Sequence, residues 1–395
     1  MTRTFKCFAH RADWDLTPNE LAHQLASRRA AGLPVLDLTE SNPTRCGLVY
    51  PEAEICQALS SPEIMRYEPQ PRGLLETRRA IAQYYREHGE DIDPDHLLLT
   101  ASTSEAYTHL FRLLAEPGDE VLVPQPSYPL FDFLAQICDL SLVRYPLEQR
   151  TGWRLDRSAL RGALSERTRT IVAVSPNNPT GSFLAPDDRD FLLVLCAERS
   201  LALIVDEVFA DYAFDESFES PPWPGEPPAL VFRLNGISKM LGLPQLKLAW
   251  INPAGPMALL DPALARLEVI ADTFLSVNTP VQVALPQLLE LRPQIQQAIC
   301  NRLRVNWAYL EGLKPPPPWA LLPAQGGWYG ILKMPSARSE EEWALGLLED
   351  EGIYAYPGYF FDFAEEPYLV LSLLLSPDRF AAGIARMAEY ICRKG

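Results

Sequence analysis

The chain has 395 residues, 47% of them hydrophobic and 22% charged, with a formal net charge of −16. This length fits two domains, or one large domain with a smaller one attached, and the composition is that of a globular protein, not of a disordered one. The negative charge disfavours a nucleic-acid-coating protein, because the backbone phosphates would be repelled. No apolar run reaches the roughly 18 residues needed to cross a bilayer.

The first expected elements are two helices separated by a short strand. A helix is predicted at 18–31, with Thr17 as its cap and Glu20 completing a capping box. A strand is predicted at 35–38, and helix signals resume at 73–87, where apolar residues form one stripe.

From about residue 96 the pattern becomes regular. Strands are predicted at 96–100, 120–124, 141–145, 170–174, 201–207, 230–236 and 247–251, and helices at 101–115, 128–138 and 187–199. This alternation predicts an α/β fold with a mainly parallel central sheet sandwiched by helices. The proline-rich stretches 220–228 and 313–319 are expected to be loops. We expect a large domain at 45–290 and a smaller α+β domain made of 1–44 plus 291–395.

The cysteines, the histidines and the N-terminus indicate where the protein is located and which kinds of site it lacks. The seven cysteines are scattered singly, which is typical of a reducing cytoplasm and not of a disulfide framework or a zinc site. The N-terminus has no apolar core of signal-peptide length, so we expect a cytoplasmic protein. The five histidines show no ligand spacing, and we expect no metal. No GxGxxG, GxxxxGK[ST] or GxSxG motif occurs, which removes the simplest nucleotide-binding and serine-hydrolase functions.

Polar residues follow several of the predicted strands, at the edge where ligands bind in such sheets. Hydroxyl residues at a helix start can cradle a phosphate, and an acid after a buried strand needs a cation. A lysine nearby can form a Schiff base once it is neutral. Together these features indicate a pyridoxal phosphate site. In chain order the residues are Ser102-Thr103-Ser104, Asn177-Asn178, Asp206-Glu207 and Ser238-Lys239.

Six segments in the right order and spacing make the chain resemble the class I/II aminotransferases, the aspartate-aminotransferase-like family of fold type I, over roughly residues 20–390. The segments are RYEPQPRGLLETRRAIA (66–82), TASTSEA (100–106), PQPSYP (124–129), SPNNPTG (175–181), DEVFADY (206–212) and ISKMLGLPQLKLAW (237–250). The resemblance implies an enzyme that uses pyridoxal 5'-phosphate to move an amino group between an amino acid or amine and a 2-oxo acid. It also implies a homodimer with shared active sites.

The resemblance assigns roles to individual residues. Lys239 would be the Schiff-base lysine and the general base, and Asp206 would keep the pyridine nitrogen protonated. Asn178 would direct its amide at the ring oxygen, and Tyr128 would stack on the ring. The phosphate would be held by the start of the helix, by the lysine segment and by a residue of a neighbouring subunit. The residues in these last positions are Ser102, Thr103, Ser238, Lys247 and Tyr67.

The sequence departs from the family pattern at several positions. Phe209 stands where a tyrosine usually donates to the ring oxygen, and Lys247 replaces the usual arginine of the phosphate site. Gly236 replaces a serine, and Gln245 and Ala249 replace glycines; the sequence offers no physical account of these last two replacements.

The largest departure concerns the substrate. Val370 stands in the segment YLVLS (368–372), where the family has an arginine that clamps the substrate's α-carboxylate. Either another cation binds the carboxylate or the substrate lacks it. Asn42 and Arg45, in the loop after the first strand, are the candidate substrate-binding residues. A pyridoxal-phosphate-dependent lyase or decarboxylase on the same fold is the alternative function. A non-catalytic regulatory module is disfavoured, because the predicted helix at 18–31 runs almost directly into the enzyme-like part and the acidic charge opposes DNA contact.

Overall fold

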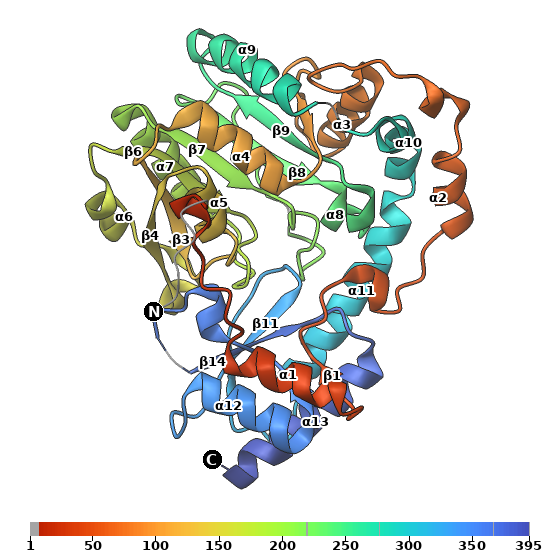
Figure 1. Cartoon of the computed structure of the whole chain (residues 1–395), viewed down its shortest axis with the longest axis vertical. Helices are drawn as coiled ribbons and strands as arrows, with labels where there is room; N and C mark the ends of the chain where they lie inside the picture. The colour runs from red at the N-terminus through yellow and green to blue at the C-terminus, as the bar shows by residue number, and fades with distance from the viewer. Residues whose placement is uncertain (1–7, 219, 276, 366, 395) are drawn as a thin grey trace.

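The computed structural model describes residues 8–218, 220–275, 277–365 and 367–394. An eight-stranded sheet, in the order β2-β9-β8-β7-β6-β3-β4-β5, forms the centre of the larger part of the molecule (Figure 1). Its strands are β2 (Leu98–Thr100), β3 (Glu120–Gln125), β4 (Ser141–Glu148), β5 (Arg154–Leu155), β6 (Thr168–Val174), β7 (Ala202–Asp206), β8 (Val231–Gly236) and β9 (Ala249–Ala254).

The sheet is mainly parallel, as the sequence predicts. Strand β3 pairs in parallel with β4 and β6, and β7 pairs in parallel with β6 and β8. Strand β9 is antiparallel to both of its neighbours, and β5 is antiparallel to β4. Because helices cover both faces, the middle strands are apolar on both sides, and every residue of β7 is buried.

Two separate hydrophobic clusters cover the two faces of the middle strands of this sheet, and at its β2–β9 end Leu99 and Trp250 belong to a third cluster. One cluster includes Val172, Ile204 and Phe232 and is covered by α4 (Thr103–Leu114), α5 (Phe131–Ile137) and α9 (Met257–Phe274). The other includes Leu203 and Val205 and is covered by α6 (Arg157–Ala163) and α7 (Pro186–Arg199). Alternate residues of one strand therefore face different layers of the protein.

A smaller part of the molecule lies at the lower end of Figure 1, where segments from both ends of the chain meet. Its four-stranded antiparallel sheet has the order β10-β11-β14-β13, and β1 pairs in parallel with β12. The strands are β1 (Leu36–Asp37), β10 (Ala320–Leu321), β11 (Tyr329–Lys333), β12 (Ile353–Tyr354), β13 (Tyr356–Pro357) and β14 (Tyr368–Ser372). The helices are α1 (Glu20–Ala30), α12 (Glu340–Gly346) and α13 (Pro377–Lys394).

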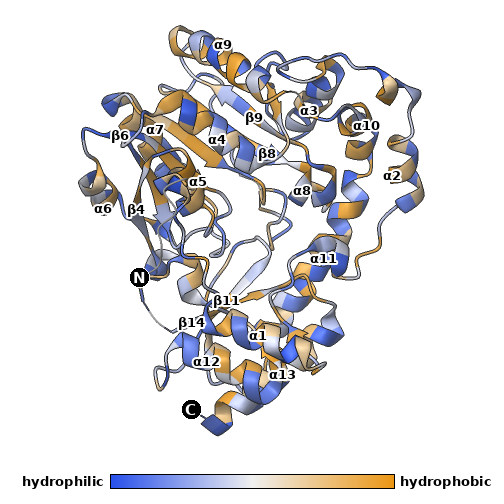
Figure 2. Cartoon of the chain, in the orientation of Figure 1, coloured by the Kyte–Doolittle hydropathy of each residue, from blue (hydrophilic) through white to orange (hydrophobic). Residues whose placement is uncertain are grey.

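The remaining helices link and cover these parts. The long helix α11 runs down from the larger part to the smaller one in Figure 1, and Figure 2 shows that it carries both hydrophobic and hydrophilic residues. The Asn306 side chain on α11 donates to the carbonyls of Leu373 and Leu375, both at 2.8 Å, and so ties the helix to the end of β14. The bounds are α2 (Glu52–Ala58), α3 (Leu75–Glu87), α8 (Ile237–Met240), α10 (Thr279–Glu290) and α11 (Arg292–Glu311).

The cap of the first helix differs from the prediction. Helix α1 begins at Glu20, and its cap is Asn19, whose side chain accepts a hydrogen bond from the Ala22 N–H at 2.8 Å. Thr17 is instead in a turn, where its N–H donates to Asp15 Oδ1 at 2.9 Å. The predicted capping box from Thr17 to Glu20 is therefore wrong, because Asn19, two positions later, accepts the hydrogen bond from a backbone N–H of the first turn. The division into domains at residues 45 and 290 stays a prediction.

Candidate active site

A cavity of about 800 Å³ lies at the carboxyl ends of the central strands, against the smaller part of the molecule. It brings together most of the residues that the sequence singled out, from segments more than 140 positions apart in the chain. Those that line it are Ser102, Thr103, Tyr128, Asn178, Asp206, Ser238, Lys239 and Lys247. The sheet explains this convergence, because parallel strands deliver their following residues to one edge.

Asp206 is the last residue of β7, and its carboxylate is buried at the base of the cavity. Its Oδ1 accepts a hydrogen bond from the Val208 N–H at 3.1 Å, and its Oδ2 accepts one from the Tyr107 hydroxyl at 3.1 Å. Burial raises the pKa of Asp206 to about 6, and these two donors and the Lys239 charge oppose the rise. The carboxylate is thus ionised at neutral pH, although the hydrogen-bond donors that hold it are neutral.

Lys239 lies on α8, which begins directly after β8. Its Nζ is 5.1 Å from the ring centre of Trp328 and 5.7 Å from that of Phe209. Burial lowers the pKa of Lys239, while the Asp206 carboxylate opposes the shift. The Tyr212 hydroxyl donates to the Lys239 carbonyl at 2.5 Å and fixes the backbone below the amine. A desolvated lysine of this kind is more readily neutral and nucleophilic.

The two adjacent asparagines after β6 have different surroundings. Asn177 Oδ1 accepts from the Thr180 hydroxyl at 3.0 Å, so this side chain stabilises the turn. Asn178 lines the cavity, and its buried Oδ1 has no hydrogen-bond partner among the described residues. A buried amide oxygen without a partner is costly, which indicates that a ligand group completes this site.

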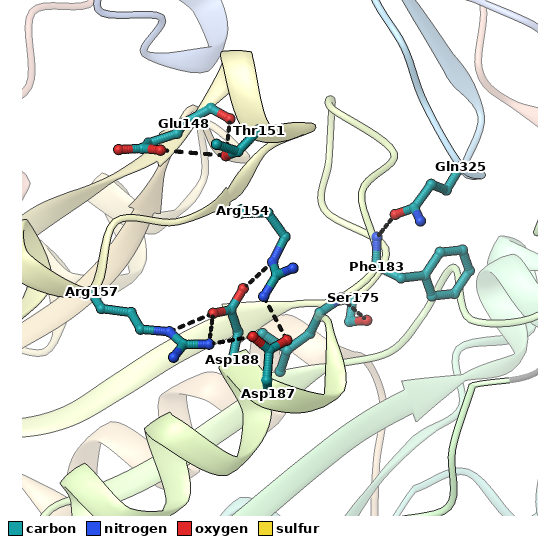
Figure 3. Close-up of polar contacts among 10 residues, drawn as sticks. Glu148, Thr151, Arg154, Arg157, Ser175, Phe183, Asp187, Asp188 and Gln325 are labelled. Carbon is teal, nitrogen blue, oxygen red and sulfur yellow. Dashed lines mark hydrogen bonds and ion pairs between the residues drawn. The ribbon is translucent and has the colours of Figure 1, made fainter.

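The turn that aims Asn178 is locked against the loop at 324–327. Gly181 has φ +68°, and a Cβ there would lie 2.2 Å from the Gly326 carbonyl oxygen, so only glycine fits. The N–H groups of Gln325 and Gly326 donate to the Gly181 carbonyl at 3.1 and 3.0 Å. Figure 3 shows the contact beside it, in which the Phe183 N–H donates to Gln325 Oε1 at 2.9 Å.

The hydroxyl residues at the start of α4 have the arrangement expected for an anion site. Ser102 caps the helix, accepting from the Glu105 N–H at 3.2 Å, and Thr103 and Ser104 follow it into the cavity lining. Ser238 and Lys247 line the same cavity, so hydroxyls, a helix N-terminus and an ammonium group share one space.

Two departures from the family pattern are explained by one contact. Gly236 on β8 and Ala249 on β9 are direct partners across the antiparallel pair. A Cβ on residue 236 would lie 2.8 Å from the Ala249 Cβ, closer than two such atoms can approach. The methyl group missing at 236 is therefore present at 249, and the two replacements compensate each other.

Three of the sequence candidates lie outside the cavity lining. Tyr67 is 75% exposed. Asn42 caps the short 3-10 helix Pro43–Arg45, where its Oδ1 accepts from the Thr44 N–H at 3.1 Å, and Arg45 itself is exposed. The same loop reaches the cavity through Ser41.

The position of the missing arginine is closed to the cavity. Val370 is fully buried between Ile331 on β11 and Tyr356 on β13, in a cluster that also contains Phe361. No arginine lines the cavity among the residues that the structure describes, and its cations there are Lys239 and Lys247.

Sequence reasoning missed Tyr107 and the aromatic wall. Tyr107 lies one helical turn after Thr103, a spacing that could have placed both on the same face of α4. The wall comes from segments that sequence reasoning left unassigned, namely the short strands β11, β12 and β13 and the residues next to them. The aromatic residues of the wall are Tyr329, Tyr354, Tyr356, Phe360 and Phe361.

The comparisons with known proteins agree with this geometry. The sequence profile of the family "Aminotransferase class I and II" matches residues 34–377. The chain belongs to this family. It is 26% identical to the alanine aminotransferase of Mycobacterium tuberculosis over 385 residues, which cover 93% of this chain and 88% of the relative. It is 24% identical to the glutamate-pyruvate aminotransferase AlaA of Escherichia coli, with 91% of each chain covered.

Solved structures of this family share the fold. The alanine aminotransferase of Pyrococcus furiosus superposes with a TM-score of 0.86 at 23% identity, covering 98% of this chain and all of the other. The aspartate aminotransferase of Thermotoga maritima gives 0.83 at 20% identity, again over 98% of this chain and all of the other. The protein is an aminotransferase, and members of its family depend on pyridoxal phosphate. These relatives do not support the alternative of a lyase or decarboxylase.

The residues present fit pyridoxal phosphate. The cavity combines a buried acid, a desolvated amine, an asparagine amide and a hydroxyl-rich helix start. In the described part of the chain there is no group of three or more metal-binding side chains, and no helix there is long and apolar enough to cross a membrane.

Proposed function

We propose that the aminotransferase acts on an amine or 2-amino acid with an uncharged side chain, with a 2-oxo acid as acceptor. The observation that carries this proposal is the lining of the cavity, which is aromatic on the side of the smaller sheet and has no arginine among its described residues. A second carboxylate on the substrate would enter this space without a guanidinium partner, at a high desolvation cost. Relatives named for alanine, a donor with an uncharged side chain, support the same class. The Escherichia coli relative is named for glutamate and pyruvate, so glutamate is the donor against which the proposal is tested.

Tyrosine hydroxyls are the donors available to the substrate on this side. Burial raises the pKa of Tyr329 and of Tyr354 to about 12, so both remain protonated at physiological pH. They can donate to a single carboxylate or carbonyl oxygen. Neutral donors bind such a group less strongly than an arginine clamp would. The cavity would therefore tolerate donors that lack the α-carboxylate better than an arginine-clamped site does.

Within this function the residues would divide the work as follows. Asp206 would accept the ring N–H of the cofactor, the side-chain NH2 of Asn178 would donate to the ring oxygen, and Tyr128 would stack on the ring. The start of α4 with Ser238 and Lys247 would hold the phosphate. When bound, pyridoxal phosphate supplies an aldehyde carbon for the amino group and a ring that accepts electrons. Lys239 Nζ would hold that carbon covalently at rest. Once the substrate's amino group has taken its place on the carbon, the freed amine would carry the proton from the substrate's α-carbon.

We also propose a cytoplasmic homodimer, with a large domain at 45–290 and a small domain of 1–44 plus 291–395. Tyr67 is 75% exposed and Met65 is 84% exposed, which suits a surface that a second copy covers. In such a dimer Tyr67 would reach the phosphate of the neighbouring subunit. Light scattering with size-exclusion chromatography tests the assembly, and loss of cofactor affinity in Tyr67→Phe tests the shared site.

A half-transamination screen tests the substrate class. The holoenzyme is mixed with single donors, and conversion of the cofactor to its amine form is followed by absorbance. The panel contains alanine, leucine, phenylalanine, glutamate, aspartate and 2-phenylethylamine. We expect the second-order rate constants of the uncharged donors to be at least about 10-fold larger than those of glutamate and aspartate. Burying the second carboxylate of these donors without a cation costs more than about 1.4 kcal/mol. Glutamate or aspartate as the best donor would overturn the proposal.

A further inference from the structure

The Asp206 carboxylate accepts two hydrogen bonds, and one of them comes from the buried side chain of Tyr107. Tyr107 is 3% exposed, and its hydroxyl donates to Asp206 Oδ2 at 3.1 Å. The other donor is the Val208 backbone N–H on Oδ1. Each carboxylate oxygen thus has one protein donor and keeps a free lone pair toward the cavity.

The ring of Tyr107 is held so that its hydroxyl has one direction. It packs edge-on against Phe131 at 5.2 Å between ring centres and lies 5.8 Å from Phe111. Phe131 itself lines the cavity, so an apolar ring separates most of Tyr107 from the substrate space. The hydroxyl therefore reaches the acid but not the cavity.

Tyr107 can only donate to this carboxylate. Burial and the Asp206 charge raise the pKa of Tyr107 well above 10, so the phenol is neutral throughout the working range. The other titratable groups that face Asp206 are Tyr128 and Lys239, and the Lys239 charge lowers the pKa of Asp206. A hydrogen bond from a fixed neutral donor favours the ionised acid without neutralising it.

We propose that Tyr107 is a positioning residue, which holds Asp206 ionised and correctly oriented for the ring nitrogen of the cofactor. This inference deepens the proposed function at the same site, and it depends on cofactor binding and not on which amine reacts. If the enzyme proves to act on another class of amino donor, the role proposed for Tyr107 is therefore unaffected. The neutral donor keeps the full negative charge available for the pyridinium.

Cofactor binding to the apoprotein tests this role. The dissociation constant of pyridoxal phosphate is measured by fluorescence from pH 5 to 9 for wild type and Tyr107→Phe. The variant loses one hydrogen bond to a charged group, so we expect affinity to fall about 10-fold at pH 7. Because the donor favours the ionised acid, the pKa of Asp206 rises in the variant. The dissociation constant of the variant divided by that of wild type should then be larger at pH 7 than at pH 9.

Tyr145→Phe is the matched control. Tyr145 is 1% exposed in the same sheet, and its hydroxyl donates to the Val172 carbonyl at 2.7 Å, away from the cavity lining. We expect a ratio near 1 at every pH for this variant. A second readout is the ¹⁵N shift of ring-labelled cofactor, which should show less protonated nitrogen in Tyr107→Phe than in wild type.

A ratio for Tyr107→Phe that stays constant with pH, or an unchanged ¹⁵N shift in the folded variant, would overturn the role. Should Tyr107→Phe fail to fold, 3-fluorotyrosine at position 107 replaces it, since it is nearly the same size and a stronger donor. The pH below which cofactor binding weakens should then move down. A shift upward, or none, would also count against the inference.

Discussion

Asp206 and Glu207 are adjacent acids with opposite surroundings. Both are 8% exposed, but they face different sides of the central sheet. Glu207 also lines a cavity, but it is paired there, accepting from Arg233 at 2.9 Å and from Trp223 Nε1 at 2.9 Å. Arg233 also pairs with Glu90. Asp206 has two neutral donors and an open cavity in front of it.

The two asparagines in the turn after the neighbouring strand, β6, repeat this difference. Asn177 Oδ1 accepts a hydrogen bond from Thr180 within the turn, whereas Asn178 Oδ1 has no partner among the described residues. After β6 and at the end of β7 alike, a residue that stabilises the fold and a residue that lines the cavity are adjacent in the sequence. Substitutions on the cavity side should therefore remove chemistry and spare stability, and those on the other side should do the reverse.

Lys239→Ala should have the largest effect on the cavity side. The variant lacks the amine that binds the cofactor carbon and moves the proton, so half-transamination should slow on the order of 10⁴-fold. Its apoprotein should melt no lower than wild type, because a desolvated amine is removed. Borohydride treatment followed by peptide mapping should find no adduct at residue 239. Lys314→Ala, at an exposed loop lysine, is the control and should behave as wild type.

The pair Asp206→Asn and Glu207→Gln tests the comparison most directly. Asp206→Asn should slow half-transamination about 10²-fold to 10³-fold, because the charge that faces the ring is lost. Glu207→Gln should leave that rate within about 2-fold. It should lower the free energy of unfolding by about 2–3 kcal/mol, because Arg233 remains buried with only Glu90 as an ionic partner.

Urea unfolding of both apoproteins and single-turnover absorbance measure these two effects. An Asp206→Asn apoprotein that is clearly less stable than wild type at pH 7.5, or a Glu207→Gln enzyme with a 100-fold lower rate, would break the comparison. Either result would mean that the two faces are coupled.

The asparagine pair extends the test with smaller effects. Asn177→Ala loses the bond to the Thr180 hydroxyl and should cost about 1 kcal/mol of stability. Asn178→Ala removes an unpartnered buried oxygen, so stability should not fall, while cofactor affinity should drop about 10-fold. Urea unfolding and cofactor titration of both variants separate the two roles. The reverse pattern would show that the amides had been assigned the wrong way round.

The sequence predicted the larger part of the fold well and the smaller part poorly. The alternating buried strands and amphipathic helices from residue 96 to 251 have periods that are readable without the structure. The strands β12 and β13, which carry Tyr354 and Tyr356, have two residues each, too few for any period to appear. The aromatic wall that they help to build could therefore not be foreseen.

The candidate site was predictable where a residue directly follows a strand or begins a helix, as Asp206 and Ser102 do. It was not predictable where the contact crosses between elements. Tyr107 reaches Asp206 across 99 positions, and the exchange between Gly236 and Ala249 depends on the register of β8 and β9. Such pairs are far apart in the sequence and are brought into contact only by the fold.

The smallest predicted effect is the pH dependence that Asp206 gives to the apoprotein. The folded pKa of about 6 lies above the unfolded value of 3.8. Protonation therefore stabilises the folded state, fully below 3.8, and this contribution is lost as the pH rises through 6. Between pH 5 and pH 8 wild type should lose about 1 kcal/mol relative to Asp206→Asn, in which residue 206 does not titrate. Urea unfolding of both apoproteins at the two pH values measures the difference, and other carboxyl groups cancel. A difference of zero or of opposite sign would mean that the Lys239 charge and the two donors fully offset the effect of burial on the pKa of Asp206 in the apoprotein.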